Sequence, residues 1–293
     1  MQRFSGVIPY LATPVLASGE IDEAALSAHC RHLIDQGVHG LTPLGSTGEF
    51  AYLDAAQRRR VVEIVTTAAA GRVPVIPCIS AAATPGALAQ LRACEQLGAS
   101  GVVVVLETYF PLQPAEVEAY FTTIADQSHL PVIIYTNPSF QRTDLTVELI
   151  ARLARHPNIV GLKDASGQTG RLLSLINRCG DDLDIFAASA HIAVAVMMIG
   201  GRGLFAGPAS IVPRPYVELY ELCRARRWEA AIALQKRLWA INEVFARYNL
   251  AACVKAALAL QGHDFGAPIA PQSGVSPAGL AEIEKTLAAL AAS

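Results

Sequence analysis

Charged side chains are scarce in this sequence. Asp, Glu, Lys and Arg make up only 16% of the 293 residues, whereas 52% are hydrophobic and the formal net charge is -2. A chain of this composition can bury a large core and lacks the polar tracts of disordered proteins. The one dense basic run, Arg58-Arg59-Arg60, lies in a helical pattern that indicates a solvated face. We therefore expect no nucleic-acid partner.

Three further absences narrow the class of protein. The six cysteines lie far apart without a C-x-x-C pair, which fits neither a zinc site nor a secreted disulfide framework. The longest apolar run, 192–199, is much shorter than the roughly 20 residues of a membrane-spanning helix. The N-terminal segment is interrupted by Pro9 and Pro14 and has no secretory apolar region. These features predict a soluble, cytoplasmic protein with reduced thiols and no membrane partner.

Two sequence patterns alternate along the chain. Short apolar runs with many β-branched residues alternate with longer amphipathic stretches, which is typical of parallel β/α architecture. The predicted strands are 6–12, 40–44, 73–79, 101–106, 132–135, 159–163, 183–187 and 203–206, each followed by a helical pattern. Eight such units, in a chain longer than the roughly 250 residues of a typical barrel, predict a (β/α)8 TIM barrel.

Local signals agree with this count. Residues typical of helix starts precede several helical patterns: Asp22, Asp54, Thr84-Pro85, Pro114 and Thr146. Glycines typical of helix ends follow four of them: Gly37, Gly71, Gly98 and Gly180. After the eighth unit, further helices are expected at 227–248, 250–261 and 277–292. We therefore expect a barrel over residues 1–226 and a C-terminal helical extension of the same domain over 227–293.

Lysine is also scarce, and one lysine stands apart from the others. Lys236, Lys255 and Lys285 lie in the C-terminal amphipathic segments, where a solvated position is expected, whereas Lys163 ends the predicted strand 159–163. Barrel strands end at the C-terminal mouth, where active sites of this fold are built. A mostly apolar pocket disfavours an ammonium group, so a lysine there can attack a carbonyl carbon and form an imine. The structural alternative is an ion pair with Asp164.

Two other strand ends carry suitable polar groups. Tyr135 ends the preceding strand, and a phenol can relay a proton because it both donates and accepts; a half-buried structural aromatic is the alternative. The segment Gly45-Ser46-Thr47-Gly48-Glu49 follows the second strand. Its glycines free the backbone, so that N–H groups and hydroxyls can hold a carboxylate; an ordinary βα turn is the alternative.

These three places together resemble the dihydrodipicolinate synthase and N-acetylneuraminate lyase family, the pyruvate-dependent class I aldolases. The segment 45–49 is similar to the family's G-x-T-G-E motif, Tyr135-Thr-Asn-Pro138-Ser139 to its Y-x-x-P segment, and 161–167 to its G-x-K-[DE]-x-[ST] motif. Their order and spacing match from about residue 4 to residue 290. The family fold is the barrel expected from the strand count.

The resemblance implies a role for each motif. Lys163 would be the Schiff-base lysine and Tyr135 the proton-shuttling phenol, while Ser46 and Thr47 would bind the carboxylate of a 2-oxo acid and extend the proton relay. Gly48 would let the backbone approach that carboxylate. The family also implies a homotetramer, commonly a dimer of dimers, in which an aromatic residue of one subunit reaches the neighbouring site.

The sequence departs from the family pattern around the second substrate. Tyr109-Phe110 stands where a Tyr-Tyr pair is common, and Phe140 occupies the position of the arginine with which synthases hold the second substrate's carboxylate. Arg142 lies two residues further on, where its side chain would be aimed elsewhere. We expect Tyr109, Phe110 and Phe205 to contact the substrate and to make the acceptor pocket more apolar than in the synthases.

The seventh strand shows another departure. The run Ala187-Ala188-Ser189-Ala190-His191 lacks the acidic residue with which sugar-acid lyases bind polyol hydroxyls. His191 begins this loop and is kept as a substrate-contact candidate. His29 and His32 are three residues apart in a helical pattern without a third ligand at suitable spacing, so they are interpreted as solvated.

The sequence therefore predicts a Schiff-base lyase or aldolase, or a dehydratase, that acts on pyruvate or a 2-keto-3-deoxy acid and needs neither metal nor organic cofactor. One alternative is 4-hydroxy-tetrahydrodipicolinate synthase, which would have to work despite Phe110 and Phe140. A metal-dependent barrel aldolase would need a cluster of histidines and carboxylates at strand ends. The non-enzymatic alternative is a degenerate barrel that binds a 2-oxo acid without turnover.

Overall fold

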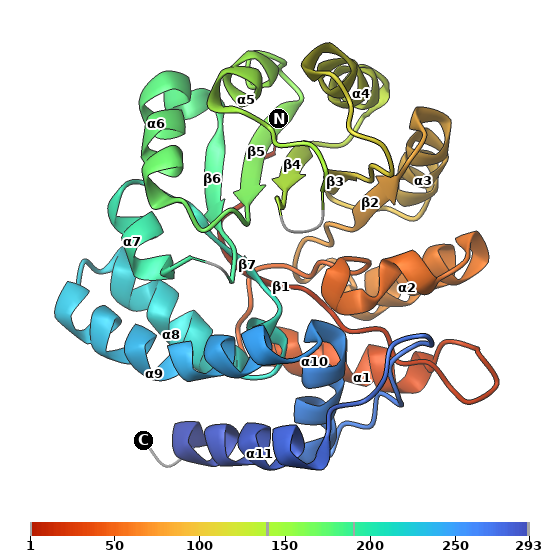
Figure 1. Cartoon of the computed structure of the whole chain (residues 1–293), viewed down its shortest axis with the longest axis vertical. Coiled ribbons are helices and arrows are strands. Elements are labelled where there is room, and N and C mark those ends of the chain that lie inside the picture. The colour runs from red at the N-terminus through yellow and green to blue at the C-terminus, as the bar shows by residue number, and fades with distance from the viewer. Residues whose placement is uncertain (1, 139–140, 190, 292–293) are drawn as a thin grey trace.

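The computed structural model describes residues 2–138, 141–189 and 191–291. Its central sheet contains seven parallel strands, in the order β1-β7-β6-β5-β4-β3-β2. The strands are β1 (Gly6–Pro9), β2 (Cys78–Ala81), β3 (Val102–Leu106), β4 (Val132–Thr136), β5 (Ile159–Asp164), β6 (Asp184–Ala187) and β7 (Gly203–Ala206). The sheet is curled and surrounded by helices (Figure 1), so the fold is TIM-barrel-like.

The predicted strand 6–12 ends earlier in the structure, at Pro9, and two other predicted strands differ more. The predicted strand 40–44 forms only isolated bridges, from Thr42 to Tyr10 and from Leu41 to Val75, and β2 begins at Cys78 instead of residue 73. Proline explains both differences, because it has no N–H to donate to a strand ladder. Pro43 lies inside the first segment, and Pro74 and Pro77 interrupt the second.

The segment around Thr42 nevertheless connects the two edges of the sheet. Thr42 N donates to Pro9 O and Leu11 N donates to Thr42 O, each at 3.0 Å. On the other side, Cys78 N donates to Pro43 O at 2.9 Å. Residues 41–43 thus lie hydrogen-bonded between β1 and the start of β2, where the sequence places its second strand.

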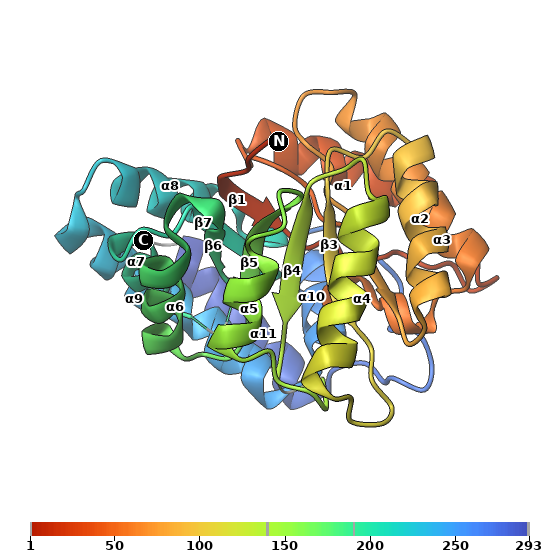
Figure 2. The same ribbon diagram turned by 90° about the horizontal axis from the view of Figure 1, so that it is seen from above.

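Eleven α-helices are present in the described part of the chain. They are α1 (Glu23–Asp35), α2 (Ala55–Ala69), α3 (Thr84–Gln96), α4 (Pro114–Gln127), α5 (Val147–Leu153), α6 (Thr169–Cys179), α7 (Ala193–Met198), α8 (Pro213–Arg224), α9 (Trp228–Arg247), α10 (Leu250–Leu260) and α11 (Pro277–Ala291). Helices lie outside the strands in both views, while α9, α10 and α11 follow one another along one side (Figures 1 and 2). No helix in these ranges has the length and apolar character needed to cross a bilayer.

The expected helix caps are confirmed. Asp22 accepts from Ala25 N at 2.9 Å, Thr146 accepts from Leu149 N at 3.2 Å, and Asp54 forms a reciprocal capping box with Gln57. All four predicted helix-ending glycines have positive φ, a conformation that side chains with a Cβ rarely adopt. All six cysteines are buried and free.

Apolar side chains fill the space inside and around the sheet. The strand residues of the central cluster are almost fully buried, and Phe186 and Phe205 meet edge to face in the interior, with ring centroids 5.0 Å apart. A second buried cluster joins α9, α10 and α11, with Phe245, Val254, Phe265 and Ile283 among its members. The C-terminal helices therefore have apolar packing of their own and also reach the main cluster through Leu234 and Leu238.

The expectation that His29 is solvated is wrong. His29 is 1% exposed, and His263, which the sequence places 234 residues away, lies beside it and His32. The ring centroids are 5.8 Å apart for His29 and His263 and 5.3 Å apart for His32 and His263. Within the described ranges, no group of three or more His, Cys, Asp or Glu side chains has the geometry to hold a metal ion. Burial, followed by the two neighbouring imidazoles, lowers the pKa of His29 to about 3.

This histidine cluster should make the fold sensitive to acid. A histidine with a lowered pKa stays neutral in the fold and takes up a proton on unfolding, so its stabilisation is present above pH 6.5 and is lost as the pH falls toward 3. Each such proton contributes a slope of up to about 1.4 kcal/mol per pH unit. We expect urea unfolding between pH 7 and 4 to show a steeper loss of stability for wild type than for His29→Leu.

The exposed His129 provides the control for this comparison. His129→Gln should retain the wild-type dependence of the unfolding free energy on pH. Equal slopes for wild type and His29→Leu would contradict the assignment.

Candidate active site

Lys163 occupies the end of β5, next to Tyr135 at the end of β4. The two residues are register partners in the sheet, and Lys163 is 6% exposed. The Nζ atom of Lys163 lies 3.5 Å from the ring centroid of Tyr135 and 4.9 Å from that of Tyr10. Aromatic faces thus surround the amine on two sides, and the neighbourhood expected for Lys163 and Tyr135 is present.

Asp164 is not the partner of Lys163. Successive side chains of a strand point to opposite faces, so Asp164 points away from Lys163. Its carboxylate, which is completely buried, lies 3.0 Å from Nε of Arg171 and accepts from Ser166 N at 2.6 Å. Among the described residues, no carboxylate oxygen lies within 4 Å of Lys163 Nζ.

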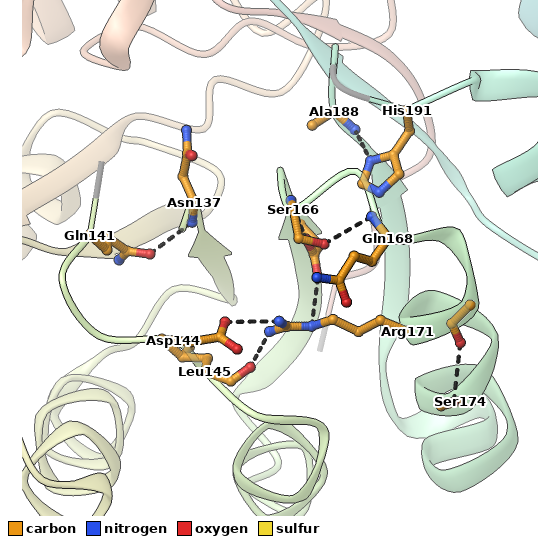
Figure 3. Close-up of polar contacts among 12 residues, drawn as sticks. Asn137, Gln141, Asp144, Leu145, Ser166, Gln168, Arg171, Ser174, Ala188 and His191 are labelled. Atoms are coloured by element: carbon orange, nitrogen blue, oxygen red, sulfur yellow. Dashed lines mark hydrogen bonds and ion pairs between the residues drawn. The ribbon is translucent and has the colours of Figure 1, made fainter. Parts of the chain in front are cut away.

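Arg171 holds this neighbourhood together from α6. Its guanidinium pairs with Asp144 at 2.8 Å and also donates to Leu145 O, so it joins the segment after β4 to the end of β5 (Figure 3). The Asp164 carboxylate is therefore paired with Arg171 outside the mouth, and Lys163 is a buried amine that has no acidic neighbour in the described part of the chain.

The predicted carboxylate cradle forms a tight turn beside the lysine. Residues 46–48 form a single 3-10 turn, and Thr47 and Gly48 are buried. A Cβ at Gly45 would lie 2.2 Å from the Tyr10 ring, and one at Gly48 would lie 2.9 Å from Leu11 O. Both glycines are therefore required by close approach of neighbouring groups, and Tyr10 packs directly against the start of the cradle.

Glu49 attaches the cradle to the C-terminal helices. Its backbone is left-handed, with φ of 55°, and its fully buried carboxylate lies 2.6 Å from Nζ of Lys255 in α10. The same carboxylate accepts from Ile269 N at 2.6 Å and from Gln272 Nε2 at 2.8 Å. Lys255 is 2% exposed, so the expectation of a solvated position for this lysine is wrong. Lys255 is buried because its helix, α10, packs against the turn at residues 46–48.

Breaking this ion pair should destabilise the protein strongly. Lys255→Met would leave the Glu49 carboxylate buried without its cation, which costs about 3–5 kcal/mol in comparable pairs. We expect the urea midpoint to fall for Lys255→Met and to recover in the double variant Glu49→Gln/Lys255→Met, where no charge remains buried. Lys236→Met, at an exposed site of α9, is the control. A midpoint unchanged by Lys255→Met would refute the interpretation.

A cavity of about 380 Å³ lies over Lys163, within the size range of small-molecule sites. Five of the predicted site residues line it: Lys163, Tyr135, Ser46, Thr47 and Phe205. Gly48 does not line it, and its carbonyl oxygen accepts from Thr13 Oγ1 at 2.8 Å. Strand ends and the turn after Leu44 thus bring together an amine, a phenol and two hydroxyls.

Tyr109 and Phe110 lie elsewhere. They are 75% and 72% exposed, their rings meet edge to face at 4.9 Å, and neither lines the cavity of its own chain. The guanidinium of Arg142 lies 5.8 Å from the Tyr109 ring centroid and is also outside the cavity lining. Phe140, at the position of the synthase arginine, and Ala190 lie outside the described residues.

His191 is buried behind the cavity. It is 3% exposed, its Nδ1 accepts from Ala188 N at 3.4 Å, and it does not line the cavity (Figure 3). Burial lowers the pKa of His191, an effect that Asp164 opposes, so the neutral ring is favoured. The structure therefore gives His191 a packing position below the loop and no direct access to a ligand in this cavity.

Several lining residues could not be identified from the strand-end motifs. Tyr10 follows β1, and Asn137 follows β4 and donates to Tyr135 Oη at 3.0 Å. Burial raises the pKa of Tyr10 well above its ordinary value, which favours the neutral phenol. Four further unforeseen residues come from α9: Trp239, Asn242, Phe245 and Ala246. Their spacing of three, six and seven residues marks one helix face, the only signal that was available in the sequence.

A barrel-like sheet with a buried lysine at a strand end, a neighbouring phenol and a hydroxyl-lined turn is the arrangement expected of a Schiff-base lyase. Comparison with known proteins agrees with this class. The model of the Dihydrodipicolinate synthetase family matches residues 3–290. A 4-hydroxy-tetrahydrodipicolinate synthase of Acidiphilium cryptum is 37% identical over 273 residues, which are 92% of this chain and 93% of that protein.

Solved structures give the same result. The dihydrodipicolinate synthase of Agrobacterium tumefaciens has a TM-score of 0.92 and 28% identity, with 98% of each chain covered. YagE, a prophage protein of E. coli K12 that was solved in complex with pyruvate, has a TM-score of 0.93 and 26% identity, with 99% of each chain covered. The chain belongs to the dihydrodipicolinate synthetase family and is a lyase of its Schiff-base, pyruvate-dependent class.

Proposed function

We propose that this lyase makes or cleaves a carbon–carbon bond, or eliminates water, through an imine between Lys163 and pyruvate or a 2-keto-3-deoxy acid. The observation that carries the proposal is the position of Lys163, which is buried beside two aromatic faces and lines the cavity, with no carboxylate partner among the described residues. A lysine amine in this position can attack the carbonyl carbon of a ligand held in the cavity.

The surrounding groups supply the remaining parts of the mechanism. Ser46, Thr47 and the backbone of the cradle would hold the carboxylate, which places the 2-oxo carbon over Lys163 Nζ. Attack by Nζ gives a carbinolamine, and Tyr135 would donate a proton to its hydroxyl as water leaves. The Asn137 amide, which donates to Tyr135 Oη, would stabilise the phenolate during that transfer.

The resulting protonated imine accepts electrons from the neighbouring carbon. In the condensing direction this carbon loses a proton to the relay, which gives the enamine. The enamine attacks an aldehyde carbon, the aldehyde oxygen takes up a proton from the relay, and the protonated imine is restored; cleavage is the reverse of these steps. Water then hydrolyses the imine and restores the Lys163 amine. Tyr135, with Ser46 in the relay, would move these protons, since both side chains line the cavity.

The proposal extends to the organisation of the protein. We infer a closed eight-fold barrel in which residues 41–43 take the place of the missing strand, because they hydrogen-bond to both edges of the sheet. The barrel would span residues 1–226 and the helical extension 227–293. A cytoplasmic homotetramer is proposed by family analogy, and the exposed Tyr109 and Phe110 rings are suited to an interface through which an aromatic side chain enters a neighbouring site.

Intact mass after borohydride reduction with pyruvate tests the mechanism. We expect an irreversible pyruvyl adduct on wild type and none on Lys163→Met, because reduction makes the imine permanent. Lys236→Ala, which removes an exposed lysine of α9, should form the adduct as wild type does. Absence of an adduct on folded wild type would eliminate the imine mechanism and favour the degenerate barrel.

A second candidate function is 4-hydroxy-tetrahydrodipicolinate synthase, which the name of the Acidiphilium cryptum relative favours. It requires the second substrate's carboxylate to be held at the mouth, and Arg142 lies over Tyr109 outside the cavity. We expect wild type to form the pyruvate imine and yet to consume aspartate semialdehyde poorly in a coupled assay. Rapid condensation with that aldehyde would establish the synthase.

A further inference from the structure

We infer that the second substrate is an aldehyde with an uncharged tail whose apolar, flat part packs against α9. This inference rests on the proposed function, because it assigns the part of the cavity that the 2-oxo acid leaves free. The carboxylate of the 2-oxo acid is expected at Ser46 and Thr47, and its reacting carbon is bound to Lys163. The remaining wall of the cavity therefore meets the aldehyde.

The distribution of charge excludes a second carboxylate. Among the residues that the structure describes, Lys163 is the only charged one that lines the 380 Å³ cavity, and its charge belongs to the imine. An adjoining cavity of about 560 Å³, which shares Ser46, Tyr135 and Asn137 with the first, is lined by two acidic residues and by no lysine or arginine. Within the described ranges, an anionic tail would thus meet no cation in either cavity other than the Lys163 imine, and it would lose its hydration without a partner of its own.

The two acidic residues of the adjoining cavity strengthen this argument. Glu49 is neutralised by Lys255, whereas Oε1 of Glu107, after β3, is buried without a hydrogen-bond partner. The field of Glu107 repels a second carboxylate from this side of the mouth. Anionic aldehydes such as semialdehydes of dicarboxylic acids are therefore disfavoured by both desolvation and charge.

The wall formed by α9 is apolar and aromatic. Trp239, Phe245 and Ala246 lie on the helix face that lines the cavity, with Asn242 as its only polar side chain. Phe205 and Leu250 line the same cavity from β7 and α10. Aromatic walls gain most from a flat apolar group, because the buried area is large and the ring edges and faces are complementary. An aryl or branched alkyl aldehyde has this chemistry, whereas a polyol aldehyde would lose hydrogen bonds to water there.

A panel of aldehydes with saturating pyruvate tests the inference on the wild-type enzyme. The panel contains benzaldehyde, isobutyraldehyde, glyceraldehyde and succinic semialdehyde, and the 4-hydroxy-2-oxo acid products are measured by mass spectrometry. We expect kcat/KM for benzaldehyde or isobutyraldehyde to exceed that for the other two by at least tenfold. Preference for glyceraldehyde or succinic semialdehyde, with the pyruvate imine still formed, would overturn the inference and leave the proposed function intact.

Variants of α9 provide a second, independent test. Trp239→Ala should raise KM for benzaldehyde at least tenfold without changing the yield of borohydride-trapped pyruvate. Ala246→Arg places a cation on the cavity wall and should increase kcat/KM for succinic semialdehyde relative to benzaldehyde. Ala233→Arg, at an exposed position of α9 outside the cavity lining, is the matched control and should not change the preference.

Glu107→Gln distinguishes the apolar tail from a polyol tail. If hydroxyl groups of the aldehyde were bound by the Glu107 carboxylate, this variant would lose activity with the preferred aldehyde, and the inference would be wrong. We expect kcat/KM for benzaldehyde to change less than threefold. No imine on folded wild type would refute the proposed function itself, and that result is separate from each outcome above.

Discussion

The site depends on the two-residue period of β5, which sends Lys163 and Asp164 to opposite faces of the sheet. On one face, the Asp164 carboxylate is buried against Arg171, and on the other, the Lys163 amine lies between the rings of Tyr10 and Tyr135. If the register of β5 shifted by one residue, the carboxylate would enter the mouth and the amine would leave it. The Arg171 contacts with Asp144 and Asp164 oppose such a shift, so they support the chemistry without touching the cavity.

Much of the fold could be predicted because its signals are local. Alternation of apolar runs with helical patterns identified the strands from β3 to β7, and the caps Asp22, Asp54 and Thr146 act on backbone groups three residues away. The strand prediction failed where an apolar segment contains prolines, which cannot donate a backbone hydrogen bond. The segments 40–44 and 73–79 are apolar enough for strands, but their prolines remove donors from the ladder, and apolar pattern alone does not show that loss.

The site was predictable only as far as it is built from strand ends. Lys163, Tyr135, Ser46 and Thr47 belong to strands or to the turn after one, and parallel strands bring such residues to one edge. The positions of Trp239, Asn242 and Phe245 depend on how α9 crosses the mouth, which is determined by its packing against α7, α8 and α11 and not by a strand-end motif. The burial of Lys255 and the meeting of His29 with His263 also depend on tertiary packing, because each joins segments more than 200 residues apart.

The contact between Tyr10 and Gly45 links two positions that the sequence separates by α1 and by the bridged segment 41–43. The space that a side chain at Gly45 would need is already occupied by the Tyr10 ring, which also contacts Lys163, Tyr135 and Phe205. A larger residue at 45 is therefore accessible only to a chain that has first exchanged Tyr10 for a smaller one. During divergence the order of these two substitutions is therefore fixed. Tyr10 changes first, which alters the depth of the pocket beneath the amine, and Gly45 at the start of the cradle changes afterwards.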